Sequence, residues 1–249
     1  TYTFVLNNDP KRERELYILA VDVLIHLQTK SLSQAFLSGL QKYSVGSIID
    51  EAFIFLDWYL CQILETPIAG ETRGSYQKVW KNSLSFIQNQ PYTLVLRDYH
   101  VDNLVWLEGR SGISACGLLD FQDAVAGSGI YDLVSLLEDA RRGIGMDLKD
   151  EMKERYFNSL SDLNVFHGDR NVFEQMFAVL GASRHAKVIG IFTRLAVRDG
   201  KFGYLEHIPH VWSLLEDSLE HPALRKVKAW FDKFVPKYKR QIPVLVEKT

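Results

Sequence analysis

The sequence predicts an α+β fold in which most of the chain is helical and a small β insert lies in the middle. Apolar residues recur at helical spacing on both sides of residues 93–119. That middle region instead carries short apolar runs separated by polar loops, which is typical of short strands. The 249 residues, of which 47% are hydrophobic and 24% charged, are enough to bury one sizeable core.

Three amphipathic helices are expected before the β insert. The first covers residues 9–28, with Asp9 as the N-cap and Pro10 at the first helical position, where its missing N–H is tolerated. The second, "VGSIIDEAFIFLDWYLCQIL", covers residues 45–64, and the third, "SYQKVWKNSLSFIQNQP", covers residues 75–91. The third ends with a proline, which cannot continue a helix.

Three short strands are expected in the insert, at residues 93–96, 103–107 and 114–119. The segment "EGRSG" at residues 108–112 is a turn signal between the second strand and the third. These two strands are therefore expected to form a hairpin. The chain would run out from one polar loop along the second strand and return along the third to another polar loop.

Helical periods return after the insert and continue toward the C-terminus. They cover residues 130–142, 152–160, 174–180, 186–197, 209–219 and 222–234. No internal repeat and no low-complexity tract interrupts them. The expected order is therefore helices, a small β insert and more helices, all within one lobe.

Composition argues against several classes of protein. The formal net charge of −2 gives no electrostatic reason to expect nucleic acid or a membrane surface as a partner. No apolar run approaches the length of a membrane span, and no signal-peptide pattern is present. Cys61 and Cys116 suggest neither a disulfide framework nor a zinc site, and a reducing cytosol is expected.

Two polar clusters interrupt the apolar runs of the insert. The first lies in "LVLRDYHVDNLVWL" and consists of Arg97, Asp98, His100, Asp102 and Asn103. Burying such groups without partners would cost about 1–3 kcal/mol for each group. In the second, "ACGLLDFQDA", Asp120 ends an apolar run and Gln122 and Asp123 follow it. Both clusters therefore need partners.

The expected hairpin would bring the two clusters together. Mg²⁺ takes oxygen ligands, usually one or two protein carboxylates or amides together with phosphate oxygens and water. Asn103 and Asp120 fit that need, and Asp98 is left to face a hydroxyl nucleophile. The polar groups would then be satisfied by a metal ion, a phosphate and a substrate.

The order of these residues resembles a known family of kinases. Asp98-x-x-x-x-Asn103 followed by Asp120-Phe121 resembles the catalytic and metal-binding loops of the protein-kinase-like small-molecule kinases, the aminoglycoside phosphotransferase and choline kinase superfamily. The segments "LRDYHVDNLVWL", "GLLDFQDAVAG", "YDLVSLLEDARR" and "RHAKVIGIFTRLAVRDGK" are similar to the bacterial cell-wall sugar kinases that phosphorylate the anomeric hydroxyl of N-acetylmuramate and N-acetylglucosamine. The resemblance runs from about residue 16 to residue 230.

The resemblance implies a phosphotransferase that uses ATP and Mg²⁺ and acts on a small amino sugar in the bacterial cytoplasm, in peptidoglycan recycling. It implies that Asp98 is catalytic, that Asn103 and Asp120 bind the metal, and that His100 and Asp132 support the catalytic loop. The expected substrate contacts are Gln122, Asp123, Arg141, Arg194 and Arg198.

Most of these residues also have a structural interpretation. Asp98 can pair with Arg97 or cap a helix, and Asn103 can be a turn residue. Asp132 can cap the helix that follows the insert. Gln122 and Asp123 can be turn residues. The basic residues between 184 and 201 can form a solvated stripe.

The sequence departs from the family pattern in two ways. The superfamily often has His-Gly before the catalytic Asp, whereas this chain has Leu96-Arg97, as the sugar-kinase branch tends to. The family grips ATP between a β-rich N-terminal lobe, which carries a phosphate-covering loop and a lysine, and the helical lobe. Neither feature precedes the first polar cluster.

We therefore expect residues 1–249 to be the helical C-terminal lobe of a kinase-like phosphotransferase, with the N-terminal lobe absent. On its own, this lobe is expected to be inactive. Two alternative functions stay open: a kinase for an aminoglycoside or choline-like acceptor, and a non-catalytic scaffold that kept the helical lobe. The sequence does not predict the oligomeric state.

Overall fold

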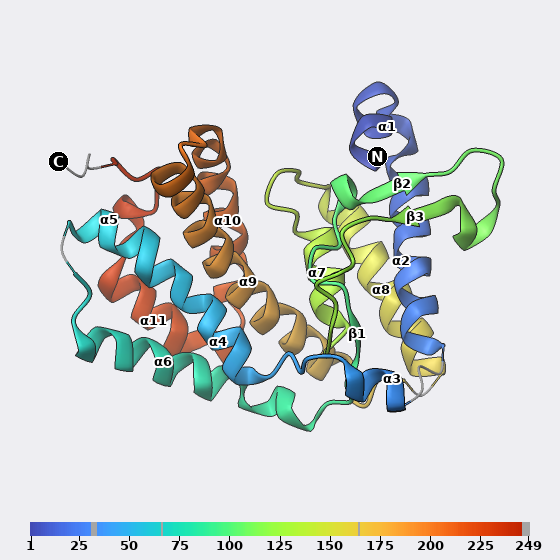
Figure 1. The fold of residues 1–249 in the computed structure, drawn as a ribbon. Coiled ribbons are helices and arrows are strands. Elements are labelled where there is room, and N and C mark those ends of the chain that lie inside the picture. The colour runs from blue at the N-terminus through green and yellow to red at the C-terminus, as the bar shows by residue number, and fades with distance from the viewer. Residues whose placement is uncertain (31–33, 66, 164, 246–249) are drawn as a thin grey trace. The chain divides into compact units, whose positions relative to one another are not determined.

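The computed structural model describes residues 1–30, 34–65, 67–163 and 165–245. The chain divides into two compact units (Figure 1). Unit 1 comprises Thr1–Tyr43 and Asn89–Glu174, and unit 2 comprises Ser44–Gln88 and Gln175–Thr249. Within the described ranges, no helix combines the length and the hydropathy that crossing a membrane requires.

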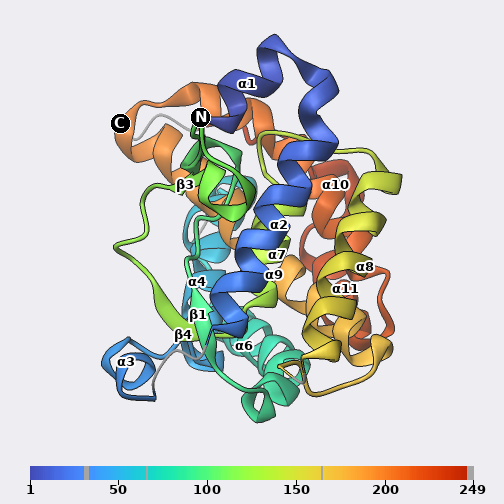
Figure 2. The ribbon, with the colours of Figure 1, turned by 90° about the vertical axis from the view of Figure 1, so that its right-hand side faces the viewer.

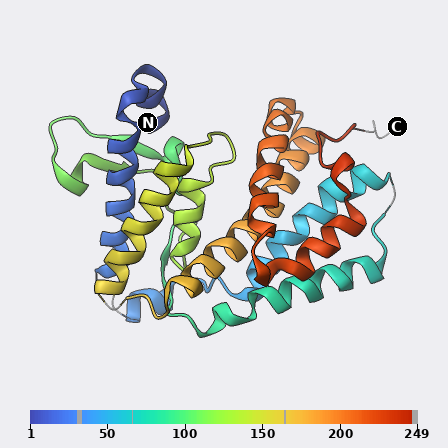
Figure 3. The same cartoon turned by 180° about the vertical axis from the view of Figure 1, so that it is seen from behind.

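Unit 1 is built from helices and from all the strands of the described residues. Its helices are α1 (Tyr2–Asn8), α2 (Glu13–Thr29), α3 (Gln34–Gly39), α7 (Ile130–Leu137), α8 (Met146–Asp162) and the start of α9 (Arg170–Asp199). Helix α2 packs against α8 and α7, and Figures 2 and 3 show α2 (blue) beside α8 (yellow).

The α2–α8 contact follows from the apolar stripe that the sequence places on each helix. Leu16, Ala20 and Leu24 lie one turn apart on α2 and are all buried, as are Met152 and Tyr156 on α8. This buried surface anchors α2, and α2 in turn supports the strands of the insert, because it also contacts β1 (Thr93–Val95) and β3 (Cys116–Leu118).

The strands form two antiparallel pairs. β2 (Leu104–Trp106) pairs with β3 (Cys116–Leu118), and Leu104 lies opposite Leu118. This pair is the expected hairpin, although residues 112–115 form a short 3₁₀ turn, so the third strand is shorter than predicted. β1 (Thr93–Val95) pairs with β4 (Val125–Gly127), a strand that was not among the expected ones.

Within its described residues, every regular element of unit 2 is a helix or a short helical turn. Its elements are α4 (Val45–Ile54), a π-helical segment (Phe55–Leu60), α5 (Cys61–Leu64), α6 (Gly70–Leu84), the rest of α9, α10 (Ile208–Leu219) and α11 (Arg225–Phe234), with short 3₁₀ segments between them. Its core is aromatic: the rings of Phe55, Tyr59, Tyr76, Trp212 and Phe231 are all buried and contact one another.

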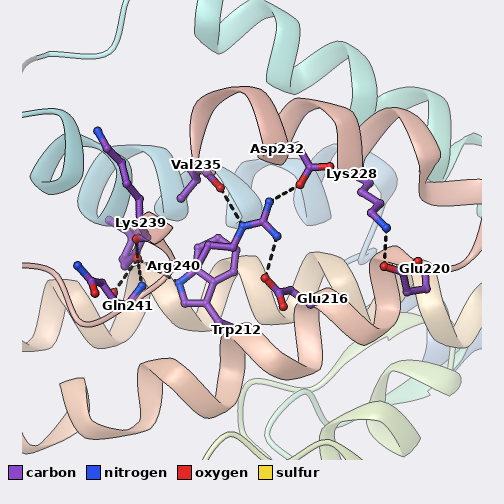
Figure 4. A network of polar contacts seen from close by, with 10 residues as sticks. Trp212, Glu216, Glu220, Lys228, Asp232, Val235, Lys239, Arg240 and Gln241 are labelled. Carbon is purple, nitrogen blue, oxygen red and sulfur yellow. Dashed lines mark hydrogen bonds and ion pairs between the residues drawn. The ribbon is translucent and has the colours of Figure 1, made fainter. Parts of the chain in front are cut away.

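A buried arginine fixes the segment that follows α11 (Figure 4). The Arg240 side chain is only 3% exposed, and its Nε donates to the Val235 carbonyl at 2.8 Å. Its terminal nitrogens pair with Glu216 at 2.8 Å and with Asp232 at 2.6 Å, and its guanidinium lies over the ring of Trp212. The Nε, Nη1 and Nη2 atoms of Arg240 therefore each donate to a partner in the chain.

A second ion pair in the same network lies nearer to solvent. Lys228 pairs with Glu220, and the exposed fractions of their side chains are 35% and 70%. Asp232, a partner of Arg240, and Lys228 both lie on α11. The buried cation of Arg240 and the more exposed cation of Lys228 can therefore be compared directly (Figure 4).

The predicted α+β class, mostly helical with a small β insert, is confirmed. Several boundaries differ from the prediction. The segments 174–180 and 186–197 belong to one helix, α9, and the helix expected over 45–64 contains the π-helical segment. The segment 9–28 begins with a 3₁₀ turn, and Asp9 makes no side-chain capping bond to it.

Candidate functional site

The first polar cluster lies in the loop between β1 and β2, in unit 1. The backbone at the start of this loop is held by Asp132, a fully buried residue in the first turn of α7. The two oxygens of its carboxylate accept the amides of Leu96 at 2.7 Å and Arg97 at 2.8 Å. Asp132 therefore ties α7 to the residues immediately before Asp98. These two bonds reach outside α7 and do not cap that helix.

Arg97 adopts a left-handed backbone conformation, with a φ of 72°. This conformation is uncommon for a residue with a side chain and is found often at functional sites. The guanidinium of Arg97 lies over the ring of Tyr43, 5.7 Å from its centroid. No ion pair joins Arg97 to Asp98 in the part of the chain that the structure describes, so that structural interpretation of Asp98 is not supported.

The middle of the loop is held to α2. The buried hydroxyl of Tyr99 donates to the carbonyl of Ala20 at 2.8 Å, and burial raises the pKa of Tyr99 well above its ordinary value. The hydroxyl therefore stays a neutral donor. His100 is also buried, and its carbonyl accepts the amide of Asn103 at 2.9 Å, which closes the turn before β2.

The end of the loop is held by two side-chain contacts. Thr3 Oγ1, from α1, donates to the carboxylate of Asp102. Asn103 Nδ2 donates to the carbonyl of Asp98 at 2.9 Å, across the loop. Because the amide nitrogen is used in this way, the side-chain oxygen of Asn103 is left to accept a cation or a donor.

The hairpin brings the second polar cluster to the first. Leu104 lies opposite Leu118, and the amide of Leu119 donates to the carbonyl of Asn103 at 2.9 Å. Asp120 is the next residue, so the hairpin brings its backbone close to that of Asn103. Asp120 is also left-handed, with a φ of 52°. The backbones of Asn103 and Asp120 are therefore close, as the hairpin prediction requires, and the role of the two side chains as metal ligands stays a prediction.

Two carboxylates of the site are exposed and have no partner. Within the described ranges, the side chains of Asp98 and Asp120 make no hydrogen bond and no ion pair. In the same loop, Tyr99, Asp102 and Asn103 each use their side chains in contacts with the chain. The two partner-free acids are therefore the groups that remain available to a ligand.

The donor set fits a hard divalent cation that takes few ligands from the protein. Among the described residues, no group of three or more His, Cys, Asp or Glu side chains is placed to hold a metal ion. Asn103 and Asp120, whose backbones are close in the hairpin, instead offer one amide oxygen and one carboxylate. Mg²⁺ bound to phosphate oxygens and water needs no more than these two.

The expected substrate residues of unit 1 lie at its surface. Gln122 and Asp123 are exposed in the loop between β3 and β4. Gln122 and Phe121 line an apolar pocket of about 410 Å³, whose other walls include Leu96 and Leu118. Arg141 is exposed just after α7 and its amide donates to Asp139. Their role as substrate contacts stays a prediction.

The basic residues of α9 do not form one solvated stripe. Arg184 is buried, and Lys187 pairs with Glu51 at 2.8 Å. Arg194 is half-buried, and Arg198 is exposed and pairs with its neighbour Asp199 at 2.6 Å. Arg194 and Arg198 both lie in unit 2, and their assignment as substrate contacts stays a prediction.

Sequence reasoning missed Thr3 as part of this site. Thr3 and Asp102 are 99 positions apart, and nothing in the local sequence of either residue points to the other. Only the packing of α1 against the loop reveals the contact.

Comparison with known proteins identifies related chains. Residues 9–171 match the model of a family described as the phosphotransferase enzyme family. A protein of Caulobacter vibrioides named N-acetylmuramate/N-acetylglucosamine kinase is 41% identical over 183 residues, which cover 74% of this chain and 49% of that protein. A protein of the same name from Pseudomonas aeruginosa is 31% identical over 220 residues, covering 88% of this chain and 62% of its own length.

One solved structure also shows a weak likeness. The ADP-bound crystal structure of aminoglycoside phosphotransferase APH(2'')-Ib is 16% identical, with a TM-score of 0.49, and the match covers 82% of this chain and 64% of that chain. The chain spans about half the length of the Caulobacter relative and less than two thirds of the Pseudomonas relative.

Proposed function

Because this chain belongs to the phosphotransferase enzyme family, we propose that the whole protein transfers a phosphoryl group from ATP to the anomeric hydroxyl of N-acetylmuramate or N-acetylglucosamine. The name that the Caulobacter and Pseudomonas relatives carry supports a sugar acceptor of this class. One observation carries the proposal: the Asn103 amide donates to the Asp98 carbonyl, and the hairpin joins Asn103 to Leu119, the residue before Asp120, while the carboxylates of Asp98 and Asp120 make no hydrogen bond and no ion pair within the described residues.

Each residue of the site has a proposed role. Asp98 orients the acceptor hydroxyl and accepts its proton as the new bond to phosphorus forms. Asn103 and Asp120 hold Mg²⁺, which, when bound, neutralises negative charge on the ATP phosphates. Asp132 keeps the backbone before Asp98 in place, and His100 closes the turn before Asn103.

The acceptor contacts are proposed from charge. N-acetylmuramate carries a carboxylate, and an arginine can bind a carboxylate through two parallel hydrogen bonds. Arg141 in unit 1, and Arg194 and Arg198 in unit 2, are each proposed separately as a partner of that group, and Gln122 and Asp123 as contacts of the sugar hydroxyls. The proposed setting is the bacterial cytoplasm, where ATP is available and where a kinase of this kind would recover amino sugars from peptidoglycan.

The test is phosphoryl transfer by the full-length protein with Mg²⁺ and ATP. The acceptors are N-acetylmuramate, N-acetylglucosamine, kanamycin and choline, and the products are identified by phosphorus NMR. We expect an anomeric sugar phosphate from one or both amino sugars and no product from the two cations. Phosphorylated kanamycin or choline would replace the sugar acceptor with a cationic one. Nucleotide binding without any product would favour a scaffold instead.

A further inference from the structure

Helix α1 lies against the loop that carries Asp98 and Asn103, and it gives that loop one polar contact. Thr3 Oγ1 donates to Asp102, the residue immediately before Asn103. We propose that Thr3 is a positioning residue, which acts through Asp102 to hold the Asn103 amide in the orientation that binds a divalent cation. This proposal rests on the proposed function and deepens it.

Thr3 is on a firmly anchored helix. Tyr2 and Leu6, one turn apart on α1, are buried, and the Tyr2 hydroxyl lies beside the Cys116 thiol of β3. Burial raises the pKa of Tyr2, so the phenol stays neutral and packs as part of the apolar core. The turn that follows α1 places the guanidinium of Arg12 over the ring of Trp106 on β2, 4.3 Å from its centroid. The N-terminal segment therefore touches both strands of the hairpin.

The loop needs such a contact at Asp102. Val101–Asn103 forms a 3₁₀ turn, whose hydrogen bonds have poorer geometry than those of an α-helix. Among the described residues, the Thr3 hydroxyl is the only hydrogen-bond donor to the Asp102 carboxylate. Without it, this carboxylate would turn toward water, and the adjacent Asn103 side chain would be oriented by its bond to the Asp98 carbonyl and by the backbone bonds of the turn, without a fixed neighbour.

Besides the bond that its carbonyl accepts from Asn103, Asp98 is held by contacts that do not involve Thr3. The backbone before it is bound by Asp132, and the residue after it is tied to Ala20 through the Tyr99 hydroxyl. Loss of the Thr3 hydroxyl should therefore disturb the proposed cation site and leave the acceptor-binding acid in place. This separation distinguishes a positioning role from a general loss of stability, which would affect both.

The experiment uses the full-length protein with the substitution Thr3→Val, which removes the hydroxyl and keeps the branched shape. Mn²⁺ replaces Mg²⁺, and its binding in the presence of ADP is measured by electron paramagnetic resonance. Partners that orient metal ligands are typically worth 10–100-fold in metal affinity, so we expect Thr3→Val to raise the Kd for Mn²⁺ about 10-fold. Thr3→Ser keeps the hydroxyl and should stay within about twofold of the wild type.

Kinetics give an independent readout. The Mg²⁺ concentration for half-maximal turnover should rise by about the same factor of 10 in Thr3→Val, while the KM of the acceptor stays unchanged. If Thr3→Val does not fold, Asp102→Ala removes the same contact from the other side, with the same expected weakening. Asp102→Asn, which keeps an acceptor oxygen, is its matched control.

The outcomes separate the two proposals. A wild-type protein that binds no Mn²⁺ with ADP and transfers no phosphate would contradict the proposed function itself. A wild-type protein that does both, with Thr3→Val or Asp102→Ala showing the same Kd for Mn²⁺, would overturn the role of Thr3. An equal fall in metal affinity and in acceptor affinity would also overturn it, because it would indicate a structural role only.

Discussion

The polar loop of unit 1 and the Arg240 network of unit 2 differ in whether a charged side chain is paired within the chain. In unit 2, the guanidinium of Arg240 is almost fully buried and meets Glu216, Asp232 and a carbonyl. In unit 1, the loop residues around Asp98 are fixed by hydrogen bonds, yet the carboxylate of Asp98 itself is exposed and has no partner among the described residues.

The difference separates polar groups that stabilise the fold from polar groups that are held ready for a ligand. A buried charge must be paired within the chain, because leaving it unpaired costs several kcal/mol. An exposed acid costs nothing of that kind, and an ordered backbone around it is then evidence of function rather than of stability. The following substitutions test this distinction in each unit.

Asp98→Asn should have the greatest effect on turnover and almost none on folding. The amide cannot accept the acceptor's proton, and removal of a positioned acid–base group typically costs about 100-fold or more. The measurement is kcat of the full-length protein, with nucleotide affinity and the urea midpoint recorded for the same sample. Asp150→Asn, on an exposed position of α8, is the matched control. Turnover within a few-fold of the wild type would remove Asp98 from the catalytic role.

Arg240→Met should lower the free energy of unfolding by about 2 kcal/mol, since it removes a buried, fully hydrogen-bonded cation. Lys228→Met removes the exposed pair with Glu220 and should cost only about 0.5 kcal/mol. Both values come from urea denaturation. Equal losses in the two variants would mean that burial does not set the value of these ion pairs.

Arg194→Ala and Arg198→Ala should change acceptor specificity by a smaller factor. If either arginine binds the carboxylate of N-acetylmuramate, its loss should raise the KM for that sugar about fivefold, which corresponds to about 1 kcal/mol, the typical net value of one hydrogen bond. The KM for N-acetylglucosamine, which lacks the carboxylate, should change less. Parallel increases for both sugars would confine the two arginines to a structural role.

Sequence patterns predicted the parts of the fold in which many residues carry the same signal. The stripe of Leu16, Ala20 and Leu24 identified α2, and all three residues are buried. The two short apolar runs around the turn at 108–112 identified the hairpin of β2 and β3. The phosphotransferase function that the loop motifs indicate agrees with membership of the phosphotransferase enzyme family.

Elements that depend on tertiary contacts could not be predicted in this way. Helix α1 contains aromatic and β-branched residues and is helical because Tyr2 and Leu6 are buried. β4 has only three residues and exists through its pairing with β1. The π-helical segment Phe55–Leu60 falls inside the helix predicted over 45–64, and the apolar pattern did not distinguish its π-turns from α-turns.

The candidate site also contains residues that the sequence pattern predicted and contacts that it could not predict. The spacing of Asp98, Asn103 and Asp120 predicted the groups that could meet a ligand, and the hairpin brings the backbones of the latter two close. The contacts that hold them join residues far apart in sequence: Thr3 to Asp102 across 99 positions and Tyr99 to Ala20 across 79. Only a three-dimensional structure places such residues together.

The left-handed backbone at Arg97 and Asp120 has a consequence for protein engineering. Such conformations cost residues with side chains about 1 kcal/mol or more, and glycine adopts them without that strain. A selection for thermostability alone is therefore expected to favour glycine at both positions, and at 120 it would delete the carboxylate. At position 120, the substitution that relieves backbone strain also removes the proposed metal ligand. Directed evolution of this chain should therefore select for stability and activity together.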